Sequence, residues 1–296
     1  MTGLLDRLVD DAGLFPPTAL APADAVRRHR ADLAAGHPLH SHRLLVPAGR
    51  LDEIRDHLDA QDRFALGLIA DGGPTDDPGA RLARAVATIA ADPRLTLALV
   101  EAPVTVFGAD PADAVPAVLD ALRDNCVPDV SVFLEPAKPA GVDALLAALP
   151  RPPARTAGVK LRCGGVRADL FPSTADVARF LVACADARVP FKATAGLHRA
   201  VRHHDPATGF THHGYLNLLL ATATARTTGD AAAVRADLEI TDPDRLAAAV
   251  RELEDVTGVR ELFVSYGSCS TATPVTEATA LLDPAVPDPA RKDPTR

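Results

Sequence analysis

The chain has 296 residues, of which 47% are hydrophobic and 4% aromatic, and its formal net charge is −8. This length suits one large α/β domain or two small ones. The excess of acidic residues argues against a nucleic-acid partner. No apolar run approaches the roughly 20 residues that span a bilayer, and the first residues lack the pattern of a signal peptide. We therefore expect a cytoplasmic protein without a membrane partner.

Two helices are expected before the first strand, over Leu4–Asp10 and Ala23–Ala35. Short apolar runs then alternate with helical patterns at roughly 30-residue spacing, as in consecutive βαβ units. The expected strands are Arg43–Pro47, Phe64–Ala70, Leu95–Glu101, Val130–Glu135, Gly158–Cys163, Val189–Thr194 and Leu262–Tyr266. The run Asp237–Thr241 is a candidate eighth strand, although the same stretch equally suits the extension of a helix.

Eight βα units in roughly 250 residues are the size of a (βα)₈ barrel. We therefore predict an α/β, TIM-like barrel over residues 1–282, with a short N-terminal helical extension over residues 1–40. Residues 283–296 form a Pro-rich polar segment that is expected to be disordered. A doubly wound open sheet is the alternative, and the absence of GxGxxG after the first strand weakens it.

Lysine is scarce in this chain. Only Lys138, Lys160, Lys192 and Lys292 occur among 31 basic residues. Arginine serves wherever charge alone suffices, whereas lysine can act as a base or a nucleophilic amine. Lys138 and Lys292 lie in polar surroundings and are expected at the surface. Lys160 and Lys192 lie in apolar strands, so we predict that both point into an active site.

The carboxyl ends of the strands carry the chemistry in such barrels. Glu101 and Glu135 end two of the predicted strands, and Arg162 and Thr194 lie two residues after the two strand lysines. Side chains alternate along a strand, so each lysine shares a face with the polar residue that follows it. The two glutamates are candidates for general acid and base. The alternative is a buried ion-pair network without catalysis.

The segment after the predicted strand Val189–Thr194 is rich in histidine. His198 follows the strand end and is a candidate proton carrier near pH 7. His213 and Asn217 lie one helical turn apart at the start of a predicted helix and are candidate substrate-binding residues. Gly267 and Ser268, after the last strand, are candidates for holding an anionic group through backbone N–H groups. A tight turn explains Gly267 and Ser268 equally well.

Residues 158–198 resemble part of the deoxyribose-phosphate aldolase family of class I aldolases. Lys192-Ala193-Thr194-Ala195-Gly196 stands where that family has Lys-Thr-Ser-Thr-Gly, and GVKLR resembles the preceding strand. The resemblance implies a Schiff base between Lys192 and a carbonyl substrate. The family's second essential lysine, on the following strand, has no counterpart here, so Lys160 would have to take over that role.

Three functions are therefore carried forward. The first is a lyase or aldolase-like enzyme that acts on a small anionic carbonyl substrate through a strand-end lysine, by Schiff base or enolate stabilisation, without a cofactor. The second is a metal-dependent hydrolase or lyase with His198, His213 and Glu101 or Glu135 as ligands. The third is a non-catalytic ligand-binding barrel. The sequence leaves open whether the chain forms a homo-oligomer.

Overall fold

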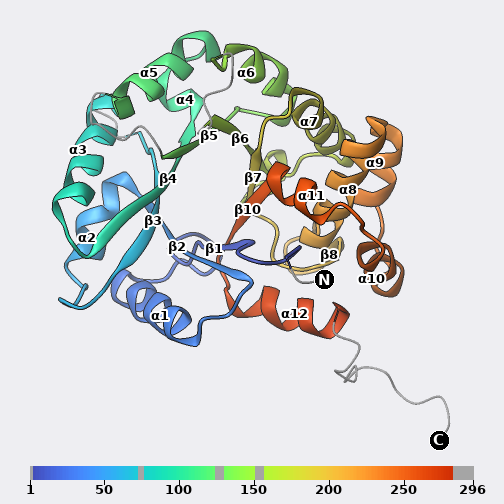
Figure 1. The fold of residues 1–296 in the computed structure, drawn as a ribbon, viewed down its shortest axis with the longest axis horizontal. Helices are drawn as coiled ribbons and strands as arrows, with labels where there is room; N and C mark the ends of the chain where they lie inside the picture. Colours follow the sequence, from blue (N-terminus) through green and yellow to red (C-terminus); the bar gives the residue numbers. More distant parts are fainter. Residues whose placement is uncertain (1–2, 73–76, 124–129, 151–156, 283–296) are drawn as a thin grey trace, which may run out of the picture.

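The computed structural model describes residues 3–72, 77–123, 130–150 and 157–282. Its parallel strands close into a barrel surrounded by helices (Figure 1), which confirms the predicted α/β, TIM-like architecture. The strands, in their order around the barrel, are β1 (Val9–Asp11), β10 (Phe263–Ser268), β7 (Phe191–Thr194), β6 (Ala157–Arg162), β5 (Ser131–Glu135), β4 (Leu95–Pro103), β3 (Phe64–Ile69) and β2 (His40–Pro47). A separate antiparallel hairpin pairs β8 (His203–Asp205) with β9 (Phe210–His212). The predicted disorder of residues 283–296 and the predicted surface position of Lys292 concern a part of the chain outside the described residues.

Seven predicted strands are confirmed, and the eighth differs from the prediction. The run Asp237–Thr241 is no strand, because helix α9 (Ala231–Leu238) extends into it. The predicted helix Leu4–Asp10 is also wrong, since the segment ends in the barrel strand β1. Three residues are too few to display an alternating pattern. Pairing on both sides determines β1 instead: Val9 lies opposite Tyr266 of β10 and opposite His40 of β2.

Helices fill the intervals between the strands and cover the outside of the barrel (Figure 1). The remaining helices are α1 (Pro22–Ala35), α2 (Leu51–Arg55), α3 (Pro78–Ala91), α4 (Val104–Phe107), α5 (Pro111–Arg123), α6 (Val142–Ala148), α7 (Thr174–Ala187), α8 (Tyr215–Thr228), α10 (Pro243–Arg251), α11 (Val256–Leu262) and α12 (Ala272–Leu282). Short 3₁₀ turns occupy Ala48–Arg50, Pro139–Gly141 and Ala168–Leu170. Within the described residues, none of these helices is long and apolar enough to cross a membrane.

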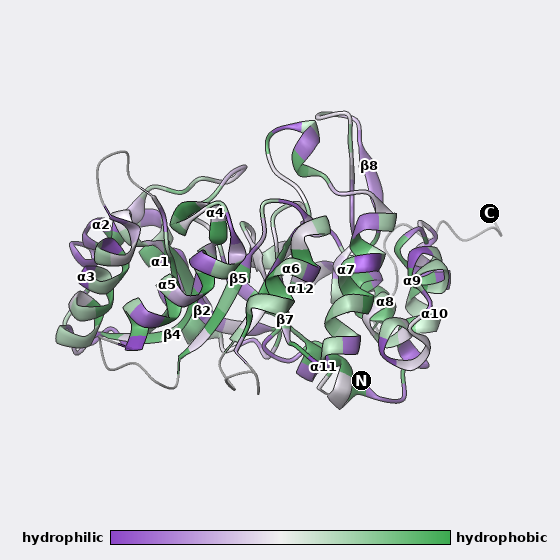
Figure 2. Ribbon diagram, turned by 90° about the horizontal axis from the view of Figure 1, so that it is seen from above, coloured by the Kyte–Doolittle hydropathy of each residue, from purple (hydrophilic) through white to green (hydrophobic). Residues whose placement is uncertain are grey.

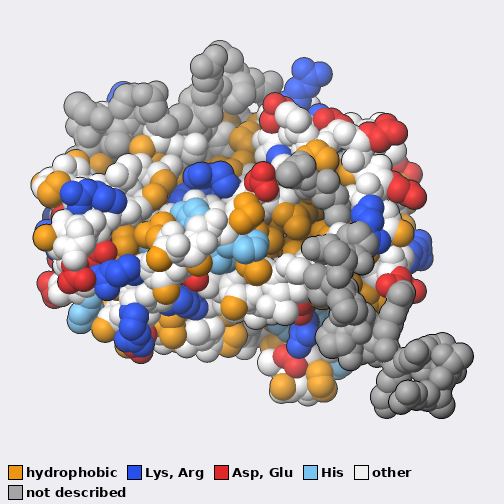
Figure 3. Space-filling model, turned by 60° about the horizontal axis from the view of Figure 1, so that its bottom comes forward, with side chains coloured by type: hydrophobic (Ala, Val, Ile, Leu, Met, Phe, Trp, Pro, Cys, Tyr) orange, Lys and Arg blue, Asp and Glu red, His pale blue; other side chains and the backbone are white. Residues whose placement is uncertain are grey.

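The core between strands and helices consists mainly of Leu, Val and Ala side chains. Figure 2 shows hydrophobic colour along much of the strands and a hydrophilic β8. Inside the barrel, Leu45 and Leu99 meet across Gly67, where an added Cβ would lie 2.4 Å from Leu45. Gly67 therefore leaves the space that the end of the Leu45 side chain occupies. On the face drawn in Figure 3, basic and acidic side chains are interspersed rather than gathered by sign.

Candidate active site

The two lysines point into the barrel from neighbouring strands, as the alternation predicted. Lys160 of β6 and Lys192 of β7 are direct partners in the strand register, and so are Arg162 and Thr194. The side chain of Lys160 is 3% exposed and that of Lys192 is 0% exposed. Two ammonium groups held side by side in a protein interior require compensating anions.

Glu101, near the carboxyl end of β4, supplies one such anion. Its Oε2 lies 2.6 Å from the Nζ of Lys160, and its Oε1 lies 2.8 Å from the Nζ of Lys192. The glutamate side chain is itself 1% exposed. One carboxylate therefore bridges both ammonium groups, which explains how the two lysines lie together.

The same pattern of alternating charge continues in both directions. Glu135 of β5 accepts from Lys160 at 2.9 Å and from the Nε of Arg162 at 2.7 Å. Asp10 of β1 contacts the Nζ of Lys192, and its Oδ1 accepts from the Nε of Arg43 at 2.7 Å. The complete series, called the ion-pair chain below, is Arg43, Asp10, Lys192, Glu101, Lys160, Glu135 and Arg162.

Two serine hydroxyl groups also contact Asp10. Ser41 donates to Oδ1 of Asp10, and Ser265 donates to Oδ2 at 2.8 Å. Arg43 also donates to the Oγ of Ser265 at 2.9 Å. Burial by itself would raise the pKa of Asp10, but Arg43 and Lys192 outweigh it and hold the pKa well below its usual range. This carboxylate is therefore fully ionised near pH 7.

The pKa values along the ion-pair chain show that its ionised form is stable. Burial opposes charge on Glu101, yet the charges of Lys160 and Lys192 lower its pKa to about 2. Burial likewise opposes charge on Lys160, and Glu101 and Glu135 more than offset it, so its pKa is raised. Burial opposes charge on Glu135 as well, but the charges of Lys160 and Arg162 outweigh it and lower its pKa. Lys160 is thus an ammonium ion in the resting protein rather than a free amine.

A cavity of about 330 Å³ lies at the carboxyl ends of β5 and β6, and Lys160 and Arg162 both line it. Phe171 and Leu170 form an apolar part of its wall, and Lys138 lies at its edge in an exposed position, as predicted for that residue. Arg162 is 37% exposed, in contrast to the buried lysines. The ion-pair chain therefore reaches a solvent-accessible cavity at one end, through two of its cations.

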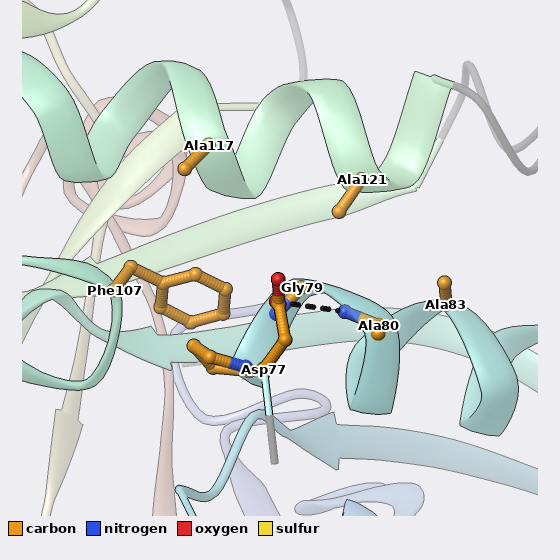
Figure 4. Close-up of a pocket in the computed structure, with 8 residues that line it drawn as sticks. Asp77, Gly79, Ala80, Ala83, Phe107, Ala117 and Ala121 are labelled. Carbon is orange, nitrogen blue, oxygen red and sulfur yellow. Dashed lines mark hydrogen bonds between the residues drawn. The ribbon is translucent and has the colours of Figure 1, made fainter.

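A larger cavity, of about 620 Å³, lies elsewhere (Figure 4). It separates α3 from α5, and Ala83, Ala117 and Ala121 face it beside Phe107. The carboxylate of Asp77 accepts from the backbone N–H groups of the first turn of α3 and so caps that helix. No member of the ion-pair chain lines this cavity, so it is a groove between helices outside the barrel.

His213 and Asn217, which follow β7 in the chain, both contact backbone groups. The Nε2 of His213 lies 2.9 Å from the backbone oxygen of Pro172, and the ring is 1% exposed. Asn217 accepts from the backbone N–H of Arg202 and donates to the carbonyls of Asp237 and Ile240. Both side chains therefore hold backbone in place, and neither lines the 330 Å³ cavity.

The burial of His213 predicts a pH dependence of stability. Burial lowers its pKa to about 4, below the ordinary value of 6.5. The unfolded chain thus binds more protons between these values, so the stabilisation is complete above about pH 6.5 and is lost as the pH falls toward 4. In wild type, the free energy of unfolding should fall by on the order of 3 kcal/mol between pH 6.5 and pH 4 because of His213. We expect His213→Gln to remove this fall, as measured by urea unfolding at a series of pH values. The exposed His204→Gln is the matched control and should leave the profile unchanged.

Gly267 and Ser268 occupy tightly packed positions at the end of β10. A Cβ added to Gly267 would lie 2.9 Å from Leu45 and 3.6 Å from the Oγ1 of Thr194. The hydroxyl of Ser268 donates to the backbone oxygen of Ser270 at 2.6 Å. Gly267 therefore permits close packing inside the barrel, and the hydroxyl of Ser268 stabilises the turn that follows.

His198 is separate from the ion-pair chain. Its Nδ1 lies 3.4 Å from the Sγ of Cys269, which follows β10. Among the described residues, no three His, Cys, Asp or Glu side chains are grouped so that they could hold a metal ion. The structure thus does not bring His198 and His213 together with Glu101 or Glu135, as the metal-site hypothesis required.

Sequence reasoning missed Asp10, Arg43 and the serines around them. The sequence pattern predicts a helix at Asp10, and a helix there would not place Asp10 beside Lys192. Arg43 begins a predicted strand, and the alternation that places Lys160 and Arg162 on one face would also have placed Arg43 and Leu45 on one face. The proximity of His198 to Cys269 was missed as well, because it depends on the closure of the barrel between β7 and β10.

Comparisons with known proteins add little to this geometry. No family model matches the chain, and no curated protein matches it. Among solved structures, the chain is similar to the citrate lyase beta subunit from M. tuberculosis, determined in complex with oxaloacetate and magnesium. The identity is 15% and the TM-score 0.36, over 81% of this chain and 100% of the other. Likeness at this level identifies no family, and the barrel itself rests on the strand pairing described above.

Proposed function

We propose that this protein is a lyase that forms or cleaves a carbon–carbon bond in a small anionic carbonyl compound. The observation that carries the proposal is the end of the ion-pair chain, where Lys160 and Arg162 line a cavity of about 330 Å³. The ion-pair chain holds four cations and three anions, a formal charge of +1. Asp169 and Asp176 also line the cavity, but Arg167 and Arg179 pair with them, so an anionic substrate there meets the net positive charge of the ion-pair chain.

Arg162 is the binding group in this proposal. Its Nε is engaged by Glu135, and the rest of its guanidinium is partly exposed at the cavity. A guanidinium presents several N–H donors in one plane, which suits a carboxylate. Arg162 therefore orients the anionic end of the substrate and places its carbonyl group toward the buried Lys160.

Lys160 is the electrophilic group. Cleavage next to a carbonyl leaves an enolate, whose negative charge develops on oxygen during the reaction. A fixed ammonium in a poorly solvated site stabilises such charge better than water does. The raised pKa of Lys160, which Glu101 and Glu135 maintain against burial, keeps that ammonium charged. Glu135, which contacts both Lys160 and Arg162, is the candidate group for accepting or donating the proton that the reaction transfers.

The geometry supports enolate stabilisation over a Schiff base at Lys192. A Schiff base requires an uncharged amine that the substrate can reach. The Nζ of Lys192 lies between Asp10 and Glu101, and its side chain is 0% exposed. In this proposal, Lys192 keeps the two carboxylates ionised and so fixes the orientation of Glu101 toward Lys160.

Two measurements test this function together. In D₂O, the protein should catalyse exchange of the protons next to the carbonyl of pyruvate or another small 2-oxo acid, followed by ¹H NMR. Borohydride added to the same mixtures should give no adduct on Lys192 by mass spectrometry. If no 2-oxo acid in a panel undergoes protein-dependent exchange or cleavage, the lyase function is wrong. A borohydride adduct on Lys192 would replace the electrostatic mechanism by the covalent one.

A further inference from the structure

A second reactive group lies at the carboxyl end of the barrel, outside the ion-pair chain. Cys269 directly follows β10, and His198 lies in the turn after β7. These strands are neighbours in the barrel, which brings the Sγ of Cys269 to 3.4 Å from the Nδ1 of His198. A thiol in contact with an imidazole has a base for its proton, which is the arrangement of nucleophilic cysteines.

The turn that carries His198 is built to bring the ring to this position. Ala195 and Gly196 both have positive φ, 57° and 69°. The turn passes close to the end of β6, where a Cβ on Gly196 would lie 2.8 Å from the backbone oxygen of Cys163. Only glycine fits this approach. The backbone of this turn therefore places His198 beside the end of β10, where its ring contacts Cys269.

The surroundings of the pair include a further imidazole with an unused nitrogen. The ring centroid of His212 lies 5.8 Å from that of His198, and the His212 side chain is 7% exposed. The Nδ1 of His212 lies 3.1 Å from the backbone oxygen of Gly196, so Nδ1 carries the proton and Nε2 is an acceptor. That buried Nε2 has no hydrogen-bond partner among the described residues. A buried acceptor without a partner is costly and indicates a polar ligand or water beside it.

Burial keeps the imidazole of His198 available as a base. Burial lowers the pKa of His198, and the more distant carboxylate of Asp205 only partly offsets this. Arg28 donates to the backbone oxygen of Cys269 at 2.7 Å while its other end pairs with Asp11. A neutral His198 can accept the thiol proton near pH 7.

We propose that Cys269 and His198 form a nucleophilic pair that captures a small aldehyde as a hemithioacetal. The thiol gives its proton to Nδ1 of His198, and a new S–C bond forms as the π electrons of the carbonyl move to its oxygen. That oxygen then takes the proton back from Nδ1, so no group leaves and no oxidant is needed. Cleavage of a β-hydroxy carbonyl compound releases an aldehyde, so this choice of reactant, although not the reactivity of Cys269, rests on the proposed function.

Labelling of the full-length protein with iodoacetamide at pH 7, followed by peptide mass spectrometry, tests the pair. Cys163 and Cys184 are internal controls, because both are 0% exposed and burial raises the pKa of both thiols, whereas Cys269, also buried, is 6% exposed. Cys269 should react at least about 10-fold faster than either. His198→Gln should remove this advantage, whereas His204→Gln at an exposed position should keep it. The two buried thiols also report on folding, since they become reactive in a variant that unfolds.

The aldehyde is tested by protection. Acetaldehyde should slow the labelling of Cys269, and acetate at the same concentration should not. The protection should persist in Lys160→Met, so that failure of the lyase proposal and failure of this one give different results. Equal labelling of Cys269, Cys163 and Cys184, or an unchanged rate in His198→Gln, would overturn the nucleophilic pair. Labelling that acetaldehyde does not slow would overturn the choice of an aldehyde.

Discussion

Replacement of Lys192 by Met is expected to lower the free energy of unfolding by about 3–5 kcal/mol. The ammonium of Lys192 lies between the buried carboxylates of Asp10 and Glu101. Its removal leaves part of their charge uncompensated in an interior where water cannot replace it. Urea unfolding at pH 7 measures the change.

Lys138→Met is the matched control for this substitution. Lys138 is exposed, so the same chemical change there should alter the free energy of unfolding by no more than about 0.5 kcal/mol. Adding Asp10→Asn to Lys192→Met removes one of the stranded charges, and we expect it to recover part of the loss. A loss below about 1 kcal/mol in Lys192→Met would show that the ion-pair chain does not depend on this lysine.

Lys160→Met is expected to reduce kcat/KM by about 10²–10³-fold, the usual effect of removing a group that stabilises developing negative charge. Lys160 meets the cavity, whereas Lys192 lies behind it. The loss should therefore appear mainly in kcat, because the interaction with Lys160 strengthens as the enolate forms. Steady-state kinetics with whichever 2-oxo acid undergoes exchange provides the measurement.

Two further variants separate this role from a purely structural one. Arg162→Met should raise KM more than it lowers kcat, since Arg162 binds the anionic end of the substrate throughout the reaction. Lys138→Met, at the edge of the same cavity, should change both constants little. If Lys160→Met folds normally and retains the wild-type kcat, Lys160 belongs to a structural ion-pair network and not to the catalytic machinery.

Much of the barrel was predictable because its longer strands carry the information locally. Alternating side chains placed Lys160 with Arg162 on one strand and Lys192 with Thr194 on the next, and in the structure Lys160 lies opposite Lys192 and Arg162 opposite Thr194. The first strand was not predictable in this way, because Val9–Asp11 is defined by its partners on both sides rather than by its own pattern. Asp10, the residue of this strand that pairs with Lys192, was therefore not predicted either.

The residues of the site were predictable only where a charged side chain lies at the end of a predicted strand. Glu101 and Glu135 were expected as compensating carboxylates and do contact Lys160, at 2.6 and 2.9 Å. The contact between His198 and Cys269 depends on the order of the strands around the closed barrel, which no local pattern contains. The prediction of His213 and Asn217 as substrate-binding residues rests on their residue types, and those types serve equally well to bind backbone groups inside a fold.

Calorimetric titration with oxalate tests the central claim most directly, because oxalate is a planar dianion that resembles the enolate of a 2-oxo acid. We predict that the wild-type protein binds oxalate and that acetate binds much more weakly. Lys160→Met and Arg162→Met should each weaken oxalate binding by about 10–100-fold, which corresponds to the loss of one charge-assisted interaction. Oxalate binding that is absent in the wild type, or equally strong in both variants, would contradict an anion site at the end of the ion-pair chain.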